Sequence, residues 1–542
     1  MLTRGLRQVH EQAWITIVFF ALGLLVAREL AEHIVDDDVK FFQLAAFGLL
    51  GCVAVVAILR NWRVGFCLFN VWLLFEDFVR KYMGNGTALF FGKDVLALLI
   101  YVSLLFAIRN GKEKRFHPPF LLWFPLSIFM WFAGFQILNP NSPSILYGLL
   151  GFKLDFFYVP MIFVGYALVR NREDLRKFLV GNAILAIIVC AVGIIQAIVG
   201  NSFLNPANLT PDLMDAVYLE KVTPLSGQVL SLPDSVFVSS GRFALYLMLV
   251  STLCIGAAGY LLLSSKSNRK VVFIAIGAIA TATLFSGSRG AVVFVSVTAV
   301  AMSIALLWGA PWRARMVHRI LKAIGWSAAI AAVGLSLAVI LYPSEVGSRV
   351  AFYTETLNPF SSAYTLQYRT VTYPIQNLTT AFDDPNWMFG NGTGTASLGL
   401  QYVARLLHSS YEGKWTESGW GELIMEMGIL APLLWVVWST SLVWCCWGVV
   451  RQLRQTAFSP LASAILWFAF TLLLLLTFGG TSAYQNYINN AFLWLLVGML
   501  FRLPEIAATP EAQVVQSRAH SNLLRLWRPS SRVRALRPEA QL

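Results

Sequence analysis

Long uninterrupted runs of apolar residues recur along the whole chain and are separated by shorter polar segments. Each run is about 17–23 residues long, which is the length that an α-helix needs to cross roughly 30 Å of hydrocarbon. The runs begin near residues 12, 41, 64, 89, 118, 147, 178, 241, 271, 290, 324, 421, 459 and 486. The pattern predicts an all-α, polytopic integral membrane protein with about fourteen membrane-spanning helices.

The first apolar run, "AWITIVFFALGLLVA", is followed by "RELAEHIVDDD". No small-residue cleavage site follows it, so we interpret this run as a retained helix and not as a removed signal peptide.

The composition agrees with a membrane protein and excludes several other classes. Of the 542 residues, 57% are hydrophobic and 13% are charged, whereas a soluble protein carries about 25% charged residues. The net charge of +13 does not indicate nucleic-acid binding, because no aromatic-basic groove pattern accompanies it. The six cysteines lie in apolar runs, the six histidines are scattered, and no HExxH motif is present. The sequence therefore predicts neither a metal nor a cofactor.

The loops predict the orientation. Basic loops such as "RNGKEKRFH" and "RNREDLRK" alternate with acidic or neutral ones, and basic loops favour the cytoplasmic side. Fourteen spans then place both termini in the cytoplasm. One basic loop, "RKYMGNG" at residues 80–86, falls on the outer side and is an exception. The tail 503–542 is basic and predicted to be disordered.

Two outer segments, 201–240 and 343–420, are long, and loops of this length are usually functional. In the second segment, between the eleventh and twelfth predicted helices, "YRTVTYPIQNLTTAF" has a helical pattern. "DDPNW" and "GNGTGT" contain turn residues. The glycine-rich stretch lacks the Lys-Ser/Thr of a nucleotide-binding loop, so it predicts tight turns.

Charged residues within or beside apolar runs gather in the outer half of the membrane. They are Lys93, Asp94, Lys153, Asp155, Arg242, Arg289, Glu422 and Glu426. Each has a simpler explanation: Arg289 and Arg242 could anchor at the interface, the Lys-Asp combinations could be structural pairs, and Glu422 could answer a helix dipole. Their one-sided distribution instead favours a polar cavity that opens outward.

Such a cavity suits an anionic, lipid-borne substrate. A guanidinium can hold a diphosphate through two hydrogen bonds, and fixed cations stabilise the charge that grows on a departing diphosphate. Deprotonating an attacking hydroxyl also needs a base. The long loop offers His408, Glu412 and Glu417.

Four stretches resemble the O-antigen ligase and O-antigen polymerase family. They are "VFVSSGRFALYLMLV", "LFSGSRGAVVFVSV" with its Ser-Arg-Gly motif, "QYRTVTYPIQNLTTAFDDPNWMFGNGTGTAS" and "TESGWGELIMEMGILAPLL". The resemblance covers residues 235–440. It divides the chain into N-terminal helices (1–234), this region with its long loop (343–420), C-terminal helices (441–502) and the tail (503–542).

The resemblance implies glycosyl transfer from undecaprenyl diphosphate to a periplasmic acceptor at the bacterial inner membrane, without nucleotide or metal. It implies that Arg289, Arg369 and Arg242 bind the diphosphate. Ser288, Gly290, Lys153 and Asp155 would have supporting roles. Many ligases carry a His-Asn pair where this chain has Glu417-Ser418, so either Glu417 or His408 would be the base.

We expect a polymerase that joins lipid-linked repeat units into an exopolysaccharide or O-antigen. A ligase that moves the glycan to lipid A-core is the second expectation, and a transporter or flippase for the lipid-linked glycan is the third. The expected partners are the undecaprenyl-diphosphate-linked oligosaccharide and a glycan acceptor. A chain-length regulator and a flippase are further candidate partners.

Overall fold

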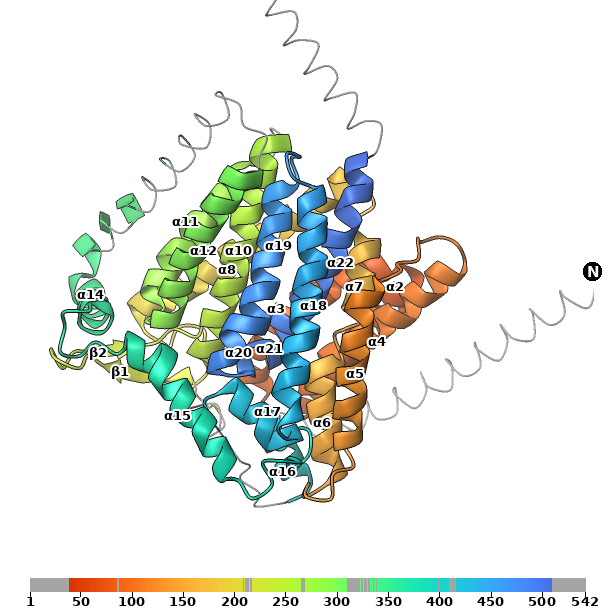
Figure 1. Ribbon diagram of the computed structural model, residues 1–542. Coiled ribbons are helices and arrows are strands. Elements are labelled where there is room, and N and C mark those ends of the chain that lie inside the picture. The colour runs from red at the N-terminus through yellow and green to blue at the C-terminus, as the bar shows by residue number, and fades with distance from the viewer. Residues whose placement is uncertain are drawn as a thin grey trace, which may run out of the picture. The chain divides into compact units, whose positions relative to one another are not determined.

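The computed structural model describes residues 39–84, 87–207, 217–264, 269–309, 341–397, 399–408 and 416–508, with isolated residues between 208 and 216 and between 322 and 340. It is mostly helical (Figure 1). The first half contains α2 (Val39–Arg60), α3 (Trp62–Met83), α4 (Thr87–Arg109), α5 (Phe120–Gln136), α6 (Ile145–Phe156), α7 (Met161–Leu168), α8 (Arg172–Val199), α10 (Ser240–Ser264), α11 (Arg269–Phe285) and α12 (Arg289–Gly309). The second half contains α14 (Pro343–Leu357), α15 (Tyr373–Thr380), α16 (Leu400–Leu406), α17 (Gly419–Met427), α18 (Leu430–Gln452), α19 (Ser459–Phe470), α20 (Leu476–Gly479), α21 (Ser482–Gln485) and α22 (Tyr487–Ala508).

The described residues contain eight helical segments that are long and apolar enough to cross a membrane. This confirms a helical, multi-pass membrane protein. The predicted count of fourteen is not reached, for local reasons: α3 carries several charges, and α5 and α11 have 17 residues each. The predicted span near residue 12 lies outside the described residues, and most of the one near 324 does too.

The chain divides into two units. Within the described residues, the first contains 39–70 and 95–103, and the second contains 71–94 and 104–508. In the first unit, Ser103 Oγ donates a hydrogen bond of 3.0 Å to the carbonyl of Ile58. All residues of the candidate site belong to the second unit.

Small residues let the helices of the second unit pack closely. A Cβ on Gly165 of α7 would lie 1.9 Å from the carbonyl oxygen of Leu495 in α22, and one on Gly498 of α22 would lie 2.0 Å from that of Ile162 in α7. Such reciprocal contact between backbones is typical of packed membrane helices.

Several of the helices are broken at one end of the bundle. The span 145–168 is interrupted between α6 and α7. After a π-helical stretch, Thr471–Leu475, and α20, the chain unwinds at Gly480 (φ 155°) before α21 and α22 begin. The predicted span at 421 starts later, because Gly428 (φ 84°) separates α17 from α18. Backbone of this kind is tolerated at membrane depth where it lines a cavity.

The long predicted loop folds against the same end of the bundle, below the starts of α10 and α12 in Figure 1. The predicted helix is present as a π-helical stretch (Tyr368–Thr372), α15 and a 3₁₀ turn (Ala381–Asp383). β1 (Glu220–Val222) and β2 (Val229–Ser231) of the other outer segment form an antiparallel hairpin beside α14.

The predicted tight turns in "GNGTGT" are confirmed. Gly390, Gly392 and Gly394 all have positive φ. A Cβ on Gly394 would lie 2.0 Å from the carbonyl oxygen of Tyr147, so only glycine lets this turn contact α6. The turn thus fixes the loop to the helices.

Candidate functional site

A single buried carboxylate holds two arginines from separate helices. Asp77 and Arg80 are one turn apart in α3 and form an ion pair of 2.9 Å. Arg242, near the start of α10, donates from Nη1 to both Asp77 oxygens at 2.7 Å. Asp77 also accepts from the backbone N–H of Val238 at 3.3 Å. A buried charge of this kind is stable only when opposite charges and donors surround it.

Two lysines are held in the same way. Lys93 of α4 forms an ion pair of 2.8 Å with Glu76 of α3. Lys153 of α6 forms one of 2.6 Å with Asp94, and the Tyr158 hydroxyl donates to Asp94 at 2.8 Å.

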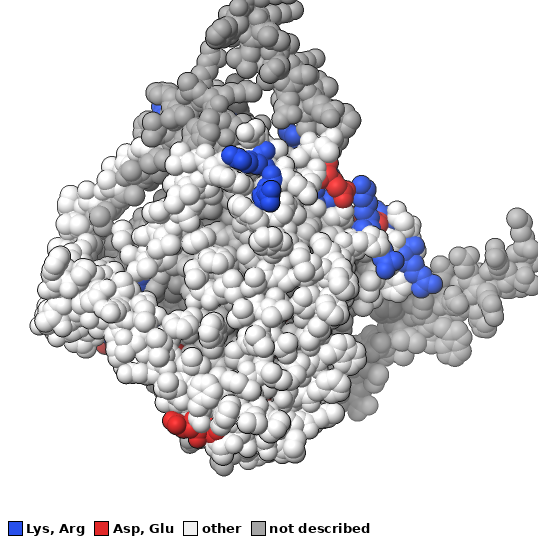
Figure 2. All heavy atoms as spheres, viewed as in Figure 1, with Lys and Arg blue, Asp and Glu red and all other residues white. Residues whose placement is uncertain are grey.

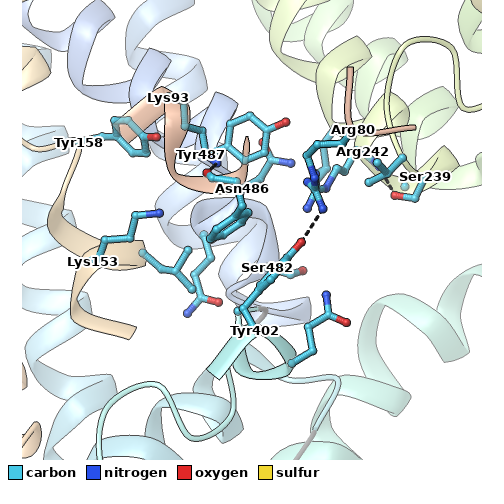
Figure 3. A pocket seen from close by; sticks show the side chains of 18 residues that line it. Arg80, Lys93, Lys153, Tyr158, Ser239, Arg242, Tyr402, Ser482, Asn486 and Tyr487 are labelled. Atoms are coloured by element: carbon cyan, nitrogen blue, oxygen red, sulfur yellow. Dashed lines mark hydrogen bonds between the residues drawn. The ribbon is translucent and has the colours of Figure 1, made fainter. Parts of the chain in front are cut away.

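These four cations line a cavity of about 420 Å³. Figure 3 shows Lys93 and Lys153 on one side, with the Lys153 ammonium pointing inward, and Arg80 and Arg242 on the other. None of their three carboxylate partners belongs to the lining. The cavity therefore presents positive charge to a ligand, with the balancing negative charge behind it.

Aromatic side chains complete the wall. Tyr402 of α16 stacks on Phe90 at 4.1 Å between ring centroids, and its hydroxyl accepts from Arg80 Nη2 at 2.5 Å. Tyr487, at the start of α22, lies beneath Arg242 and Lys93. Contacts of this type stabilise a cation on its apolar side.

The cavity explains why the basic loop at residues 80–86 does not follow the tendency of basic loops to be cytoplasmic. Arg80 and Lys81 are 1% and 2% exposed. Arg80 is paired with Asp77, and Lys81 forms an ion pair of 2.7 Å with Asp234. Both residues are buried and paired with carboxylates, so their charges do not indicate on which side of the membrane this loop lies.

A second cationic group lies around Phe352 of α14. Arg289, at the start of α12, and Lys221 of β1 lie over this ring at 5.5 and 5.6 Å. Arg289 Nη1 also donates to the hydroxyl of Thr365. Burial, together with the nearby guanidinium groups of Arg289 and Arg369, lowers the pKa of Lys221. The three cations are therefore close enough to repel one another.

The structure brings the predicted base next to a predicted arginine. Arg369 forms an ion pair of 3.2 Å with Glu417, whose side chain is 35% exposed. Arg369 also lies over the ring of Tyr373 at 4.8 Å. Glu417 thus has solvent access while it faces the cationic group. His408 is exposed, in a positive-φ conformation after α16. Glu412 lies outside the described residues.

The other predicted residues have different surroundings. Arg242 and Lys153 line the cavity, and neither contacts Arg289 or Arg369 in the described structure. The Ser288 hydroxyl accepts from Ala291 N–H at 3.3 Å and so caps α12. A Cβ on Gly290 would lie 3.7 Å from Met248 Cε, an ordinary packing distance.

Asp155 lies behind the cavity wall. It is 3% exposed, and its Oδ1 accepts from Gln485, a lining residue, at 3.3 Å. Glu422 and Glu426 are buried and accept hydrogen bonds from the backbone N–H groups of Thr481 and Ala396. These two acids hold the unwound segment and the glycine turn in place.

The two cationic groups are linked through the unwound backbone after α20. Gly419, two residues after Glu417, packs so closely that a Cβ would lie 2.1 Å from the carbonyl of Thr477. Ser482, shortly after that segment, lines the cavity. Both groups therefore lie at the end of the bundle where the helices are broken.

Sequence reasoning missed Arg80, Tyr402 and Tyr487 as site residues. The helical spacing of Asp77 and Arg80 was a usable signal, because residues three apart on a helix can pair. Tyr402 and Tyr487 carried no signal, since aromatic residues are common in apolar runs.

No protein-family model matches this chain, and no curated protein matches its sequence. In the part of the chain that the structure describes, no group of three or more His, Cys, Asp or Glu side chains is placed to hold a metal ion.

Removing the shared carboxylate should unfold the cavity. We expect Asp77→Asn to destabilise the protein by about 3–5 kcal/mol, because the buried Arg80 and the partly buried Arg242 lose their charge partner. Asp383→Asn, at an exposed position, is the matched control and should be neutral. Thermal unfolding of the purified variants in detergent measures both, and equal stability would contradict the role given to Asp77.

Proposed function

We propose that this protein is a membrane glycosyltransferase whose donor is a glycan on undecaprenyl diphosphate. The observation that supports this most directly is the group of three cations, Arg289, Lys221 and Arg369, of which Arg369 forms an ion pair with Glu417. Concentrated positive charge suits a diphosphate, which bears two or more negative charges at neutral pH. The arrangement also agrees with the resemblance to O-antigen ligases and polymerases.

The proposed chemistry needs no other energy source. The acceptor hydroxyl oxygen bonds to the anomeric carbon while the bond from that carbon to the diphosphate oxygen breaks. The electron pair of the broken bond leaves with the diphosphate, and the hydroxyl proton passes to a base. Arg289, Arg369 and Lys221 stabilise the charge that grows on the leaving group.

Glu417 is our proposed base. Its contact with Arg369 holds it beside the leaving group, and its partial exposure leaves room for an acceptor. His408 is the alternative, because it is exposed and lies on the segment that follows Tyr402.

We further propose that the cation-lined end faces the periplasm of a bacterial inner membrane and that both termini are cytoplasmic. Fourteen spans and a periplasmic loop 343–420 complete this topology. The opposite end supports it: Lys114 contacts Glu505 near the end of α22, and Arg454, just after α18, contacts the carbonyl of Trp308 near the end of α12. On the face shown in Figure 2, Lys and Arg lie in the upper middle and on the right-hand side of the view, and Asp and Glu lie at its lower edge, with a broad uncharged surface between.

We favour polymerisation of repeat units over ligation, since the Glu417-Ser418 sequence departs from the His-Asn pair of many ligases. Both cationic groups lie at one end of the second unit, whereas a transporter would need buried charges along the whole length of its path. The polymerase reading is tested with lipid-linked repeat units as the only substrate.

The purified protein in nanodiscs should convert lipid-linked repeat units into a ladder of longer glycans, and Arg289→Lys should reduce that rate about 100-fold. An ammonium cannot replace the planar fork of a guanidinium at the departing diphosphate. Arg451→Lys, at an exposed position near the end of α18, is the control and should keep the wild-type rate.

A ladder that appears only after lipid A-core is added would favour the ligase. A wild-type rate in Arg289→Lys would remove this residue from the site.

The base can be identified by two amide replacements. Glu417→Gln should lower kcat about 100-fold or more, because an amide cannot accept the hydroxyl proton. His408→Gln should stay within a few-fold of the wild type, and gel analysis of the ladder measures both rates. The reverse pattern would assign the base to His408.

A further inference from the structure

The cations of the cavity are almost fully neutralised by the protein itself. Asp77 contacts both Arg80 and Arg242, Glu76 contacts Lys93, and Asp94 contacts Lys153. Four cations thus face three carboxylates in direct contact with them. Among these directly paired groups the cations outnumber the carboxylates by only one, so the cavity suits a ligand with one negative charge better than one with several.

The second cationic group, made up of Arg289, Lys221 and Arg369, has a different balance of positive and negative charge. Glu417 contacts Arg369, and within the described residues no carboxylate contacts Arg289 or Lys221. Of the three cations only Arg369 is paired, so Arg289 and Lys221 together present two positive charges without a carboxylate in contact among the described residues. A diphosphate, with more than one negative charge, is better matched to this group than to the cavity.

The uncharged lining of the cavity suits a sugar. Gln401, Gln485, Asn486 and Ser482 line it, and these side chains both donate and accept hydrogen bonds.

Lys153 is the lysine best placed to meet a ligand carboxylate, because its side chain is 16% exposed, against 1% for Lys93. The side chain of Arg242 is 25% exposed, but its Nη1 donates to both oxygens of Asp77. Figure 3 shows the Lys153 ammonium pointing into the cavity, and the Tyr158 hydroxyl contacts its carboxylate partner, Asp94. An ammonium has three donors, and Asp94 is an acceptor for one of them.

We propose that the cavity binds an acidic sugar of the glycan, a hexuronic acid residue whose single carboxylate contacts Lys153. This inference rests on the proposed function, in which the diphosphate binds separately at Arg289, Arg369 and Lys221. The enzyme would then select repeat units by a carboxylate on the sugar as well as by the lipid diphosphate.

The first test uses wild-type protein alone, so it does not depend on the folding of a variant. Methyl glucuronide and methyl galacturonide are compared with methyl glucoside and methyl galactoside by calorimetry on the full chain in nanodiscs, at fixed salt. Within each pair the sugars differ at the carboxylate. At least one uronide should bind about tenfold or more tightly than its neutral partner, and equal binding within both pairs would overturn the proposal.

The second test separates the two cationic groups. Lys153→Gln should abolish the preference for the uronide and leave binding of inorganic diphosphate unchanged. Arg289→Lys should weaken binding of inorganic diphosphate and leave the preference for the uronide unchanged. Lys153→Arg keeps the charge and should keep the preference. Loss of diphosphate binding in Lys153→Gln, with no loss in Arg289→Lys, would show that the cavity is the diphosphate site.

Failure here and failure of the proposed function are distinguishable. A ladder formed from lipid-linked repeat units without any uronide preference would refute the sugar site and keep the glycosyltransferase. A clear uronide preference without a ladder would keep the sugar site and refute the glycosyltransferase.

Discussion

The contact of Asp77 with two arginines is the interaction on which the cavity depends. One carboxylate joins α3 to α10, and it is surrounded by Arg80, Arg242 and the N–H of Val238. Without such partners, the desolvation penalty of charges this deeply buried would exceed the stabilisation that the surrounding packing provides. Lys93 and Lys153 follow the same rule with Glu76 and Asp94. The site is therefore a set of cations whose partners stand behind them and leave the inner surface open.

Breaks in the helices bring this surface within reach of a substrate. After the unwound segment that follows α20, α21 and the residue that ends it supply Ser482, Gln485 and Asn486 to the cavity wall. Glu422 satisfies the backbone and hydroxyl of Thr481 in that segment, and Glu426 satisfies the N–H of Ala396 near the glycine turn. These two acids explain how non-helical backbone survives at this depth.

The apolar runs predicted most helices, because period and length are local properties of the sequence. The helix at 368–383 and the turns of "GNGTGT" were predicted for the same reason. Arg369 and Glu417 were proposed for one site, and in the structure they form an ion pair of 3.2 Å. The partner of Arg242 could not be predicted, since Asp77 is 165 residues away and only tertiary packing joins them. Lys221 was also missed as a member of the site, because a three-residue strand carries no pattern that places it beside Arg289.

Under the proposed function, the two cationic groups have different roles that follow from their charge. The two unpaired charges around Phe352 suit a leaving group, and a nearly balanced cavity rich in amides and hydroxyls suits recognition of a glycan. Both proposed roles require this end of the molecule to face away from the cytosol.

Labelling of single cysteines in intact cells tests that requirement most directly, with the native cysteines replaced. Gln376 of α15 and Lys112 of the loop between α4 and α5 are both exposed and lie in segments that we assign to opposite sides. A membrane-impermeant maleimide should modify Gln376→Cys in intact cells and Lys112→Cys only after the membrane is opened. The reverse pattern would contradict the account.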